Sequence, residues 1–379
     1  MLIPLALYIH IPWCIRKCPY CDFNSHQKRD ETLPETAYVN ALIDDLEHDL
    51  AGLNAKNISS IFFGGGTPSL FSPEAIQKIL TAVSTRIPYA NPTIEITLEA
   101  NPGTFERGKF EEFRSAGINR LSIGVQSFQN DKLQALGRIH DQHAAIKAAE
   151  TAHTAGFNSF NIDLMYGLPQ QTLHDAISDI QTALSLAPPH LSWYQLTLEP
   201  NTLFYNQPPP LPPDDTLADM QERCQAMLAD AGLQQYEISA YSKPEHQCQH
   251  NLNYWEFGDY LGIGAGAHGK LTDVHSKKIS RTWKKKHPKN YLDASQPYLE
   301  GTSVISEHEL PFEFMLNALR LYKPIPLSLF ETRTGLSVDV IEKKLQNAKN
   351  KGLLHDDALF IRPTELGYRF LNDLISGFI

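Results

Sequence analysis

The first 235 residues alternate between apolar runs of strand length and stretches with helical periodicity, and this alternation restricts the fold more than any other feature. Six apolar runs are each followed by a helical stretch. Strict alternation predicts a parallel sheet, because parallel neighbours need a long crossover connection, which is almost always right-handed. The predicted strands are residues 5–11, 59–63, 93–98, 120–123, 159–163 and 191–196.

Residue types that are unusual in a sheet follow these strands directly. In a barrel the strand ends converge on one mouth, where barrel enzymes keep their chemistry, whereas an open sheet spreads them along an edge. We therefore predict the fold class α/β, with a partial (β/α)6 barrel. The segments in question are a cysteine loop at 14–21, GGGTP at 64–68, EANPG at 99–103, GVQS at 124–127 and DLMYG at 163–167.

The rest of the chain has a different pattern. Residues 236–302 are polar and aromatic, and we expect a connecting region there after a barrel formed by residues 1–235. Residues 303–379 are mostly helical with a short hairpin-like piece, which predicts a winged-helix-like C-terminal domain. Such domains often bind DNA, but the acidic balance of the chain and the sparse cations of residues 338–349 favour a lid or docking domain instead.

Three of the five cysteines, Cys14, Cys18 and Cys21, fall within eight residues. Three thiolates are one short of the four that close an ordinary [4Fe–4S] site, so one iron would stay open to an exogenous ligand. That pattern indicates radical S-adenosylmethionine (SAM) chemistry, in which the methionine amine and carboxylate chelate the open iron. The weaker alternatives are a structural zinc site, which needs four ligands, and disulfides, which need an oxidising compartment.

Polar residues at the predicted barrel mouth are candidates for SAM binding. The glycines at 64–66, followed by Thr67, let the backbone approach a ligand with no Cβ in the way, although a tight turn explains them equally well. Glu99 ends a strand and suits a hydrogen bond to ribose hydroxyls. Each residue taken alone is consistent with a structural polar group. Three further members of this rim are Gln126, Arg138 and Asp163.

His250 lies among aromatic residues, with Tyr254 and Trp255 close behind it in the sequence. A neutral imidazole ligates haem iron, and flat aromatic rings pack against a macrocycle. Cys248 is a second soft ligand nearby, and a buried polar turn is the alternative interpretation. The glycines at 264–269 match a dinucleotide-binding fingerprint by letter, but no apolar helix follows them, so we reject this function.

The chain is acidic, with a net charge of −10 and a pI near 5.8, so it lacks the basic footprint of a nucleic-acid-binding protein. No apolar run approaches the length of a membrane span. The N-terminus has neither the cationic stretch nor the cleavage pattern of a signal peptide. A reducing cytoplasm is the expected location, and an oxygen-labile cluster would require it.

Several motifs together resemble the anaerobic coproporphyrinogen III dehydrogenase (HemN-like) family of radical SAM proteins. Within that family the chain is more similar to the HemW branch, the haem chaperones, than to the oxidase. It carries the HNxxYW pattern at 250–255, begins only seven residues before Tyr8, and has Phe23 where the oxidase has a further cysteine. The shared motifs are YIHIPWC at 8–14, the cysteine loop, GGGTP at 64–68, GVQ at 124–126 and DLMYGLP at 163–169.

The resemblance implies the cofactors and their ligands. It implies a [4Fe–4S] cluster on Cys14, Cys18 and Cys21, and haem ligation by His250. Thr197 and His268 lie where further SAM contacts fall, but the local match there is poor. The residues that the resemblance places against SAM are Tyr8, Tyr20, Gly65, Gly66, Thr67, Glu99, Gln126, Arg138 and Asp163.

Two functions follow from this resemblance. The first is a haem chaperone that passes haem to apo-haemoproteins, with respiratory enzymes among the candidate acceptors, and with an electron donor and a homodimer as further partners. The second is an oxygen-independent coproporphyrinogen III oxidase, in which a radical from SAM abstracts hydrogen from a propionate. Phe23, the short N-terminus and His250 favour the chaperone and argue against a conventional enzyme. The second axial haem ligand stays open among Cys248, His246, His268, solvent and none.

Overall fold

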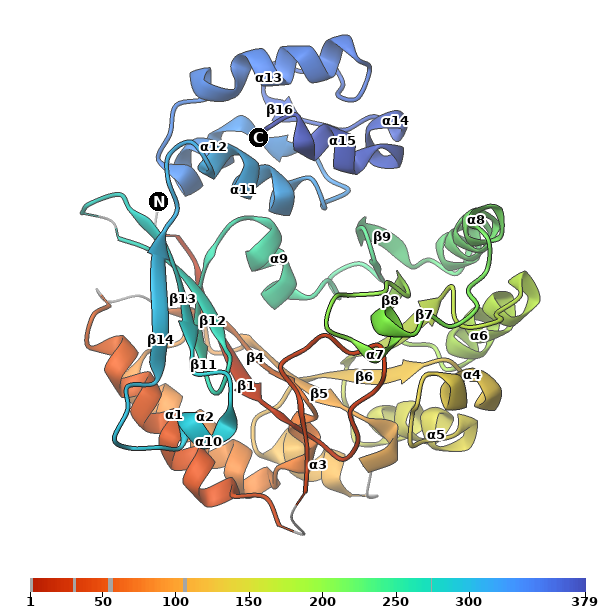
Figure 1. Cartoon of the computed structure of the whole chain (residues 1–379), viewed down its shortest axis with the longest axis vertical. Coiled ribbons are helices and arrows are strands. Elements are labelled where there is room, and N and C mark those ends of the chain that lie inside the picture. Colours follow the sequence, from red (N-terminus) through yellow and green to blue (C-terminus); the bar gives the residue numbers. More distant parts are fainter. Residues whose placement is uncertain (1–2, 30–31, 54–56, 105–107, 274) are drawn as a thin grey trace.

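The computed structural model describes residues 3–29, 32–53, 57–104, 108–273 and 275–379. Its centre is a curved sheet in which six parallel strands lie side by side in chain order (Figure 1). They coincide with the six predicted strands, and the partial barrel is confirmed. The strands are β1 (Leu5–Ile11), β4 (Ile58–Gly65), β5 (Glu95–Ala100), β6 (Arg120–Gln126), β7 (Ser159–Tyr166) and β8 (His190–Gln195).

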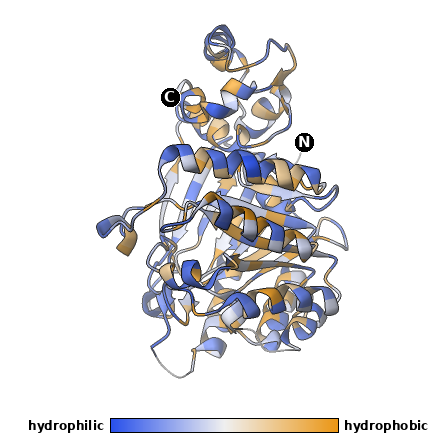
Figure 2. Cartoon of the chain, turned by 90° about the vertical axis from the view of Figure 1, so that its right-hand side faces the viewer, coloured by the Kyte–Doolittle hydropathy of each residue, from blue (hydrophilic) through white to orange (hydrophobic). Residues whose placement is uncertain are grey.

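Helices cover the outer face of this sheet and leave the inner face to the loops and to α9 (Gln249–Trp255) (Figure 1). They are amphipathic: α6 (Leu173–Ser185) buries Ala176, Ile180 and Ala183, which recur at helical spacing, and turns polar residues outward (Figure 2). The other covering helices are α1 (Glu35–Leu50), α2 (Pro73–Arg86), α3 (Lys109–Ser115), α4 (Asn130–Ala135), α5 (Gln142–Thr154) and α8 (Asp214–Asp230). None of the helices in the described ranges is long and apolar enough to cross a membrane.

Local sequence signals begin several of these helices. The Ser72 hydroxyl accepts a hydrogen bond from the N–H of Ala75 at the start of α2, and the Asp141 carboxylate accepts one from Ala144 at the start of α5. At α6, Thr172 and Asp175 form a reciprocal capping box. Each cap satisfies N–H groups that the first helical turn leaves without partners.

The sheet extends beyond the parallel strands at both edges, and the described residues contribute twelve strands to it. β11 (Asp259–Ile263) pairs in parallel with β1 on the side away from β4, and β12 (His268–Thr272), β13 (Ile279–Lys284) and β14 (Leu299–Val304) continue antiparallel from it. Beyond β8 lies a hairpin of β10 (Ala240–Ser242) and β9 (Gln234–Glu237), where the sequence predicts one strand. Apolar periodicity misses β12 to β14 because these strands carry many polar residues, and β14, at the edge of the sheet, is mostly exposed.

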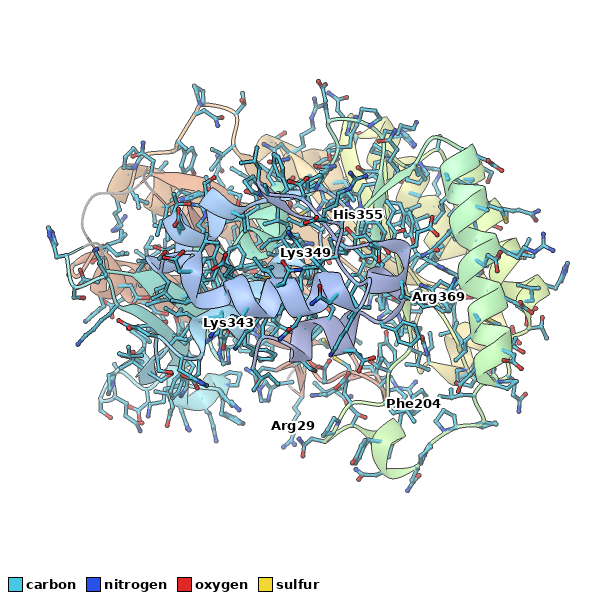
Figure 3. All side chains as sticks on the ribbon, turned by 90° about the horizontal axis from the view of Figure 1, so that it is seen from above. Arg29, Phe204, Lys343, Lys349, His355 and Arg369 are labelled. Atoms are coloured by element: carbon cyan, nitrogen blue, oxygen red, sulfur yellow. The ribbon has the colours of Figure 1, made fainter. Side chains whose placement is uncertain are left out.

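The C-terminal residues form a helical unit with its own core, which includes Phe314, Phe330 and Ile341. Seen from above, α13 crosses this unit and carries Lys343 and Lys349 (Figure 3). The last helical stretch is divided into two helices at Phe370, whose backbone leaves the helical region. The elements are α11 (Leu310–Ala318), β15 (Ile325–Pro326), α12 (Leu327–Thr334), α13 (Asp339–Asn350), β16 (Phe360–Ile361), α14 (Glu365–Arg369) and α15 (Leu371–Ser376).

Short elements complete the chain: β2 (Trp13–Cys14), β3 (His26–Gln27), α7 (Leu203–Asn206), α10 (Pro288–Tyr291) and the 3₁₀ turns 68–70 and 102–104. The division of the chain at residues 235 and 302 stays a prediction.

A buried ionic group joins the sheet extension to the barrel. Lys284, at the end of β13, is 2% exposed. Its ammonium donates to Asp45 Oδ1 at 2.5 Å and to Asp49 Oδ2 at 2.7 Å, both on α1. The Tyr291 hydroxyl donates to the other oxygen of Asp45 at 2.7 Å. Because these charges are removed from water, taking away one of them leaves the others buried without a counter-charge, which is strongly destabilising.

We expect Lys284→Met to destabilise the chain by about 3–5 kcal/mol, because it leaves buried carboxylates without their cation. Denaturant unfolding measures the loss. The control is Lys285→Met. The ammonium of Lys285 pairs with the half-exposed Glu300, so removing it should cost no more than about 1 kcal/mol of stability. Equal losses for the two variants would contradict this account.

Candidate functional site

The cysteine loop leaves the end of β1 and is closed at its base by the parallel pairing of β2 with β3. The His26 N–H donates to Pro12 O at 2.7 Å and the Lys28 N–H to Cys14 O at 2.8 Å. These bonds hold residues 15–25 as a loop over the inner face of the sheet. Within it, Cys14, Cys18 and Cys21 are half-buried and form no disulfide.

Each of the three thiols has a polar neighbour. Thr67 Oγ1 donates to Cys14 Sγ at 3.5 Å, Arg138 Nη1 donates to Cys18 Sγ at 3.8 Å, and Ser25 Oγ lies 3.6 Å from Cys21 Sγ. Burial raises the pKa of the Cys14 and Cys21 thiols, so a bound cation is needed to hold them as thiolates. Three free thiols on one loop, open to a cavity, fit a [4Fe–4S] cluster with one open iron.

A cavity of about 660 Å³ lies between the cysteine loop and the carboxyl ends of the parallel strands. Its volume is in the range of small-molecule sites. Apart from the loosely matched Thr197 and His268, the residues that the sequence assigns to the cluster, SAM or haem all line it, although they come from eight separate segments of the chain. The residues so brought together are Tyr8, Cys14, Cys18, Tyr20, Cys21, Gly65, Gly66, Thr67, Glu99, Gln126, Arg138, Asp163 and His250.

The glycines after β4 place the cysteine loop against the sheet. The Gly66 N–H donates to Ile11 O and the Thr67 N–H to Trp13 O, both at 2.8 Å. A Cβ on Gly66 would lie 2.5 Å from Trp13 O, so no other residue allows this approach. Gly65 has a φ of +114°, and its N–H donates to Glu99 Oε2 at 3.1 Å.

The half-buried carboxyl groups of Glu99 and Asp163 line the same cavity. Burial and the nearby Asp163 raise the pKa of Glu99 to about 8, so Glu99 is largely protonated at neutral pH. Asp163 accepts hydrogen bonds from Ser122 Oγ at 3.1 Å and from Asn161 Nδ2 at 2.7 Å. Burial raises the pKa of Asp163 also, and these hydrogen bonds oppose that rise. The protonated Glu99 can donate a hydrogen bond to a ligand, and the oxygens of Asp163 can accept one.

Four arginines line the cavity, Arg16, Arg120, Arg138 and Arg320, of which Arg120 is buried and Arg138 is half-buried. Arg138 Nη2 donates to Gly124 O at 2.5 Å, which places its guanidinium between β6 and Cys18. Arg120 begins β6, and its Nε lies 3.7 Å from Glu95 Oε2. The sequence analysis does not name Arg120. The signal that could have found it is a single cation in an otherwise mostly apolar strand. The sequence analysis does not name Tyr194 either, whose hydroxyl donates to Gln126 Oε1 at 2.7 Å.

His250 sits on α9 and is 1% exposed. Both ring nitrogens have hydroxyl partners: Nδ1 lies 3.0 Å from Ser60 Oγ, and Nε2 lies 2.9 Å from the Tyr254 hydroxyl. Burial and Arg120 lower the pKa of His250 to about 3, so the imidazole is neutral. Glu95 fixes the helix start by accepting from the N–H groups of Gln249 and His250.

The other residues named from the sequence lie elsewhere. Cys248 donates to Glu95 and lines neither this cavity nor its neighbour. His246 lies in a small surface hollow, and Thr197 binds Glu199. His268 lines a second cavity, of about 670 Å³, next to the first.

Comparison with known proteins agrees with this architecture. Residues 8–183 match the model of the radical SAM superfamily, and residues 305–370 match that of the HemN C-terminal domain. The solved structure of coproporphyrinogen III oxidase (HemN) from Escherichia coli superposes with a TM-score of 0.83 at 23% identity, covering 99% of this chain and 90% of that one. Fold and site thus define a radical SAM protein with a HemN-type C-terminal domain.

Full-length relatives narrow the class. The heme chaperone HemW of Escherichia coli K12 is 51% identical over 376 residues, covering 99% of this chain and 98% of the relative. The proteins of the same name from Haemophilus influenzae and Bacillus subtilis are 49% and 34% identical, each over 99% of this chain and over 98% and 99% of the relative, respectively. The chain belongs to the HemW family of radical SAM proteins.

The raised pKa of Glu99 predicts a pH dependence of stability. The folded chain binds the proton of Glu99 more tightly than the unfolded chain does. The protonated Glu99 therefore contributes its full stabilisation to the folded state below pH 4.5, and this stabilisation is lost as the pH rises to about 8. We expect Glu99→Gln to remove this loss, which amounts to a few kcal/mol because each pKa unit is worth about 1.4 kcal/mol. Denaturant unfolding of the iron-free chain from pH 5 to 9 measures it. Glu222→Gln, on exposed α8, is the control, and parallel pH profiles for wild type and Glu99→Gln would refute the assignment.

Proposed function

We propose that this chain is a haem chaperone, which binds haem and transfers it to an apo-haemoprotein. One observation carries the proposal: His250, a neutral imidazole on α9, lines the same cavity as the three cysteines. The 51% identical relative bears the name heme chaperone HemW, which supports this function. The likeness to HemN supports the fold alone and does not favour an oxidase.

The proposal includes a [4Fe–4S] cluster on Cys14, Cys18 and Cys21 and a bound SAM. When bound, these groups supply one-electron reductive chemistry. The chain's own residues hold and orient them: Thr67, Arg138 and Ser25 place a polar atom beside each sulfur, and Glu99 and Asp163 supply a donor and an acceptor. The proposed SAM-binding residues are Tyr8, Tyr20, Gly65, Gly66, Thr67, Glu99, Gln126, Arg138 and Asp163.

His250 would ligate the haem iron through Nε2. The bonding pattern is suitable, because an Nδ1–H that donates to Ser60 leaves the Nε2 lone pair directed at the Tyr254 hydroxyl. Iron ligation therefore replaces the bond to Tyr254. The same proposal assigns a cytoplasmic location, an electron donor for the cluster, a homodimeric state, and apo-haemoproteins such as respiratory enzymes as acceptors.

We expect His250→Ala to weaken haem binding about tenfold or more, because it removes the iron ligand. The test is a haemin titration of the anaerobically reconstituted chain, followed by the Soret band, with transfer to an apo-haemoprotein as a second readout. His174→Ala, an exposed histidine on α6, is the control. Coproporphyrinogen decarboxylation, with haem binding indifferent to His250, would overturn the proposal.

Tyr254→Phe should have the opposite effect on haem. Without the hydroxyl, Nε2 of His250 has no partner to give up, and a hydrogen bond of this kind is worth about 0.5–1.5 kcal/mol. We expect haem affinity to rise severalfold and the haem-free chain to lose about 1 kcal/mol of stability. Tyr298→Phe is the matched control, because its hydroxyl binds Asp44 far from the site. Unchanged haem affinity in Tyr254→Phe would show that this bond does not compete with iron.

A further inference from the structure

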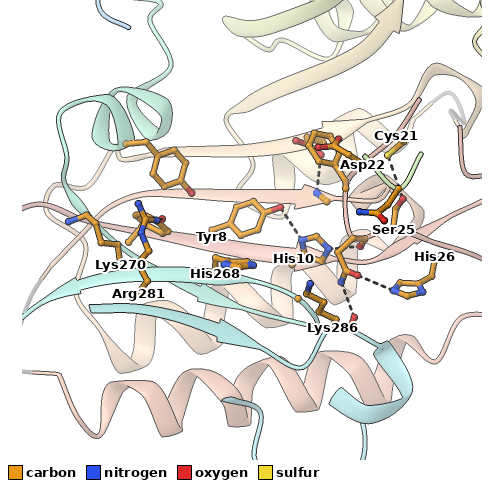
Figure 4. Close-up of a pocket in the computed structure, with 18 of the residues that line it drawn as sticks. Tyr8, His10, Cys21, Asp22, Ser25, His26, His268, Lys270, Arg281 and Lys286 are labelled. Atoms are coloured by element: carbon orange, nitrogen blue, oxygen red, sulfur yellow. Dashed lines mark hydrogen bonds between the residues drawn. The ribbon is translucent and has the colours of Figure 1, made fainter. Parts of the chain in front are cut away.

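The second cavity lies between the cysteine loop and the strands β12 and β13 (Figure 4). It has a volume of about 670 Å³. It adjoins the first cavity, because Tyr8, Cys21, Gly65, Glu99 and Tyr254 line both. A ligand in this space is therefore close to the cysteine loop and to the tyrosine that covers Nε2 of His250.

Flat aromatic side chains form much of the wall. Tyr254 and Tyr260 meet edge to face with ring centroids 4.6 Å apart, and Tyr254 contacts Trp255 in the same way at 6.5 Å. Such surfaces favour a large, flat, apolar ligand. The aromatic residues of the lining are Tyr8, Phe23, Tyr254, Trp255, Phe257 and Tyr260.

The same cavity is positively charged, although the chain as a whole carries −10. Four cations line it, Lys17, Lys270, Arg281 and Lys286, against two carboxyl groups, Asp22 and Glu99. Glu99 contributes little negative charge at neutral pH, because its pKa is about 8. An excess of positive charge in a concave, aromatic site indicates an anionic ligand.

The cations differ in how far the chain already neutralises them. Lys270 pairs with Asp259 at 3.1 Å, and Arg281 pairs with Glu313. Lys286 forms no ion pair with any residue that the structure describes, and Lys17 binds only the backbone oxygens of Phe23 and Ser25 in those ranges. Lys286 and Lys17 are thus left without a carboxylate partner among the described residues. Arg281 has five N–H donors, and its bond to Glu313 leaves some of them for a ligand.

The register of the strands explains why the positive charge gathers on this side. Lys270 of β12 pairs directly with Arg281 of β13, and His268 pairs with Trp283. Paired residues share a face of the sheet, so His268, Lys270 and Arg281 all face the cavity, with Lys286 just beyond β13 (Figure 4). Like charges directly opposite one another destabilise a sheet. Here the repulsion is relieved within the chain, by Asp259 on Lys270 and by Glu313 on Arg281.

We propose that this second cavity binds the carboxylates of haem, with the propionates at Lys286 and Arg281 and the ring against Tyr254 and its aromatic neighbours. This assignment rests on the proposed haem-chaperone function and adds the part of the site that recognises the ligand's charge. His250 selects for iron, whereas Lys286 and Arg281 select for the propionates whether or not iron is present. The two contributions are therefore separable by the choice of porphyrin.

The test is equilibrium binding to the full-length, reconstituted chain under anaerobic conditions. Three porphyrins are compared in the same detergent: haemin, haemin dimethyl ester, which lacks the carboxylates, and iron-free protoporphyrin IX. The variants are Lys286→Glu and Arg281→Gln. Lys289→Glu is the control, because it makes the same charge change three residues from Lys286 at an exposed position outside the cavity. Thermal unfolding confirms that each variant is folded.

We expect Lys286→Glu and Arg281→Gln to lower the affinity for haemin and for protoporphyrin IX about tenfold and to leave the affinity for the dimethyl ester unchanged. Lys289→Glu should bind all three as the wild type does. Raised ionic strength should weaken the binding of haemin but not that of the ester, since salt screens exposed charge pairs.

The result that overturns the proposal is haemin binding that Lys286→Glu leaves unchanged, or an ester that binds as tightly as haemin. Either outcome leaves the haem-chaperone function standing if His250→Ala still weakens both iron porphyrins. The opposite pattern is that Lys286→Glu weakens haemin binding, His250→Ala does not, and no haem is transferred to an apo-haemoprotein. That pattern supports the carboxylate site and overturns the chaperone function.

Discussion

The close approach of the backbone at Gly66 to the backbone at Trp13 is the contact on which the site depends. Two hydrogen bonds of 2.8 Å, from Gly66 to Ile11 and from Thr67 to Trp13, hold the start of the cysteine loop at the end of β4. A Cβ at Gly66 would clash with Trp13 O at 2.5 Å. The same turn directs Thr67 at Cys14 and Gly65 at Glu99, so one backbone geometry places a thiol and a carboxyl on the same cavity.

Around that contact the two cavities divide the chemistry. The first contains all three cysteines, Asp163 and His250, and the second contains most of the aromatic wall and the cations of β12 and β13. Tyr254 lines both cavities, with its hydroxyl on His250. Cys21 and Glu99 line both as well, so the two cavities are continuous at the cysteine loop.

The sequence predicts the parallel sheet well, because buried parallel strands such as LALYIHI are continuous apolar runs with little ambiguity. It also predicts which side chains meet, since the ends of parallel strands converge: residues as far apart as Tyr8 and His250 line one cavity. It does not predict β12 to β14, because strands rich in polar residues lack that signal. The basic run that includes Lys286 is best interpreted from the sequence as a solvated loop, and Arg281 is assigned no role, because only the fold places both on one cavity. The two hydroxyl partners of His250 were beyond reach too, since Ser60 lies 190 residues away.

The position of β1 has a consequence for the order in which the protein matures. β1 is the first strand of the chain, yet it lies inside the sheet, between β4 and a strand that ends at Ile263. The cysteine loop is tied in the same way, because Asn24 Nδ2 donates to the carbonyl oxygens of Ala265 and Lys286 at 2.9 and 2.8 Å. During synthesis on the ribosome, the N-terminal strand therefore leaves the exit tunnel long before its second neighbour exists. Until then it presents one open edge, and the cysteine loop lacks its bonds to Ala265 and Lys286, so this segment completes its contacts only after residue 286 has been made.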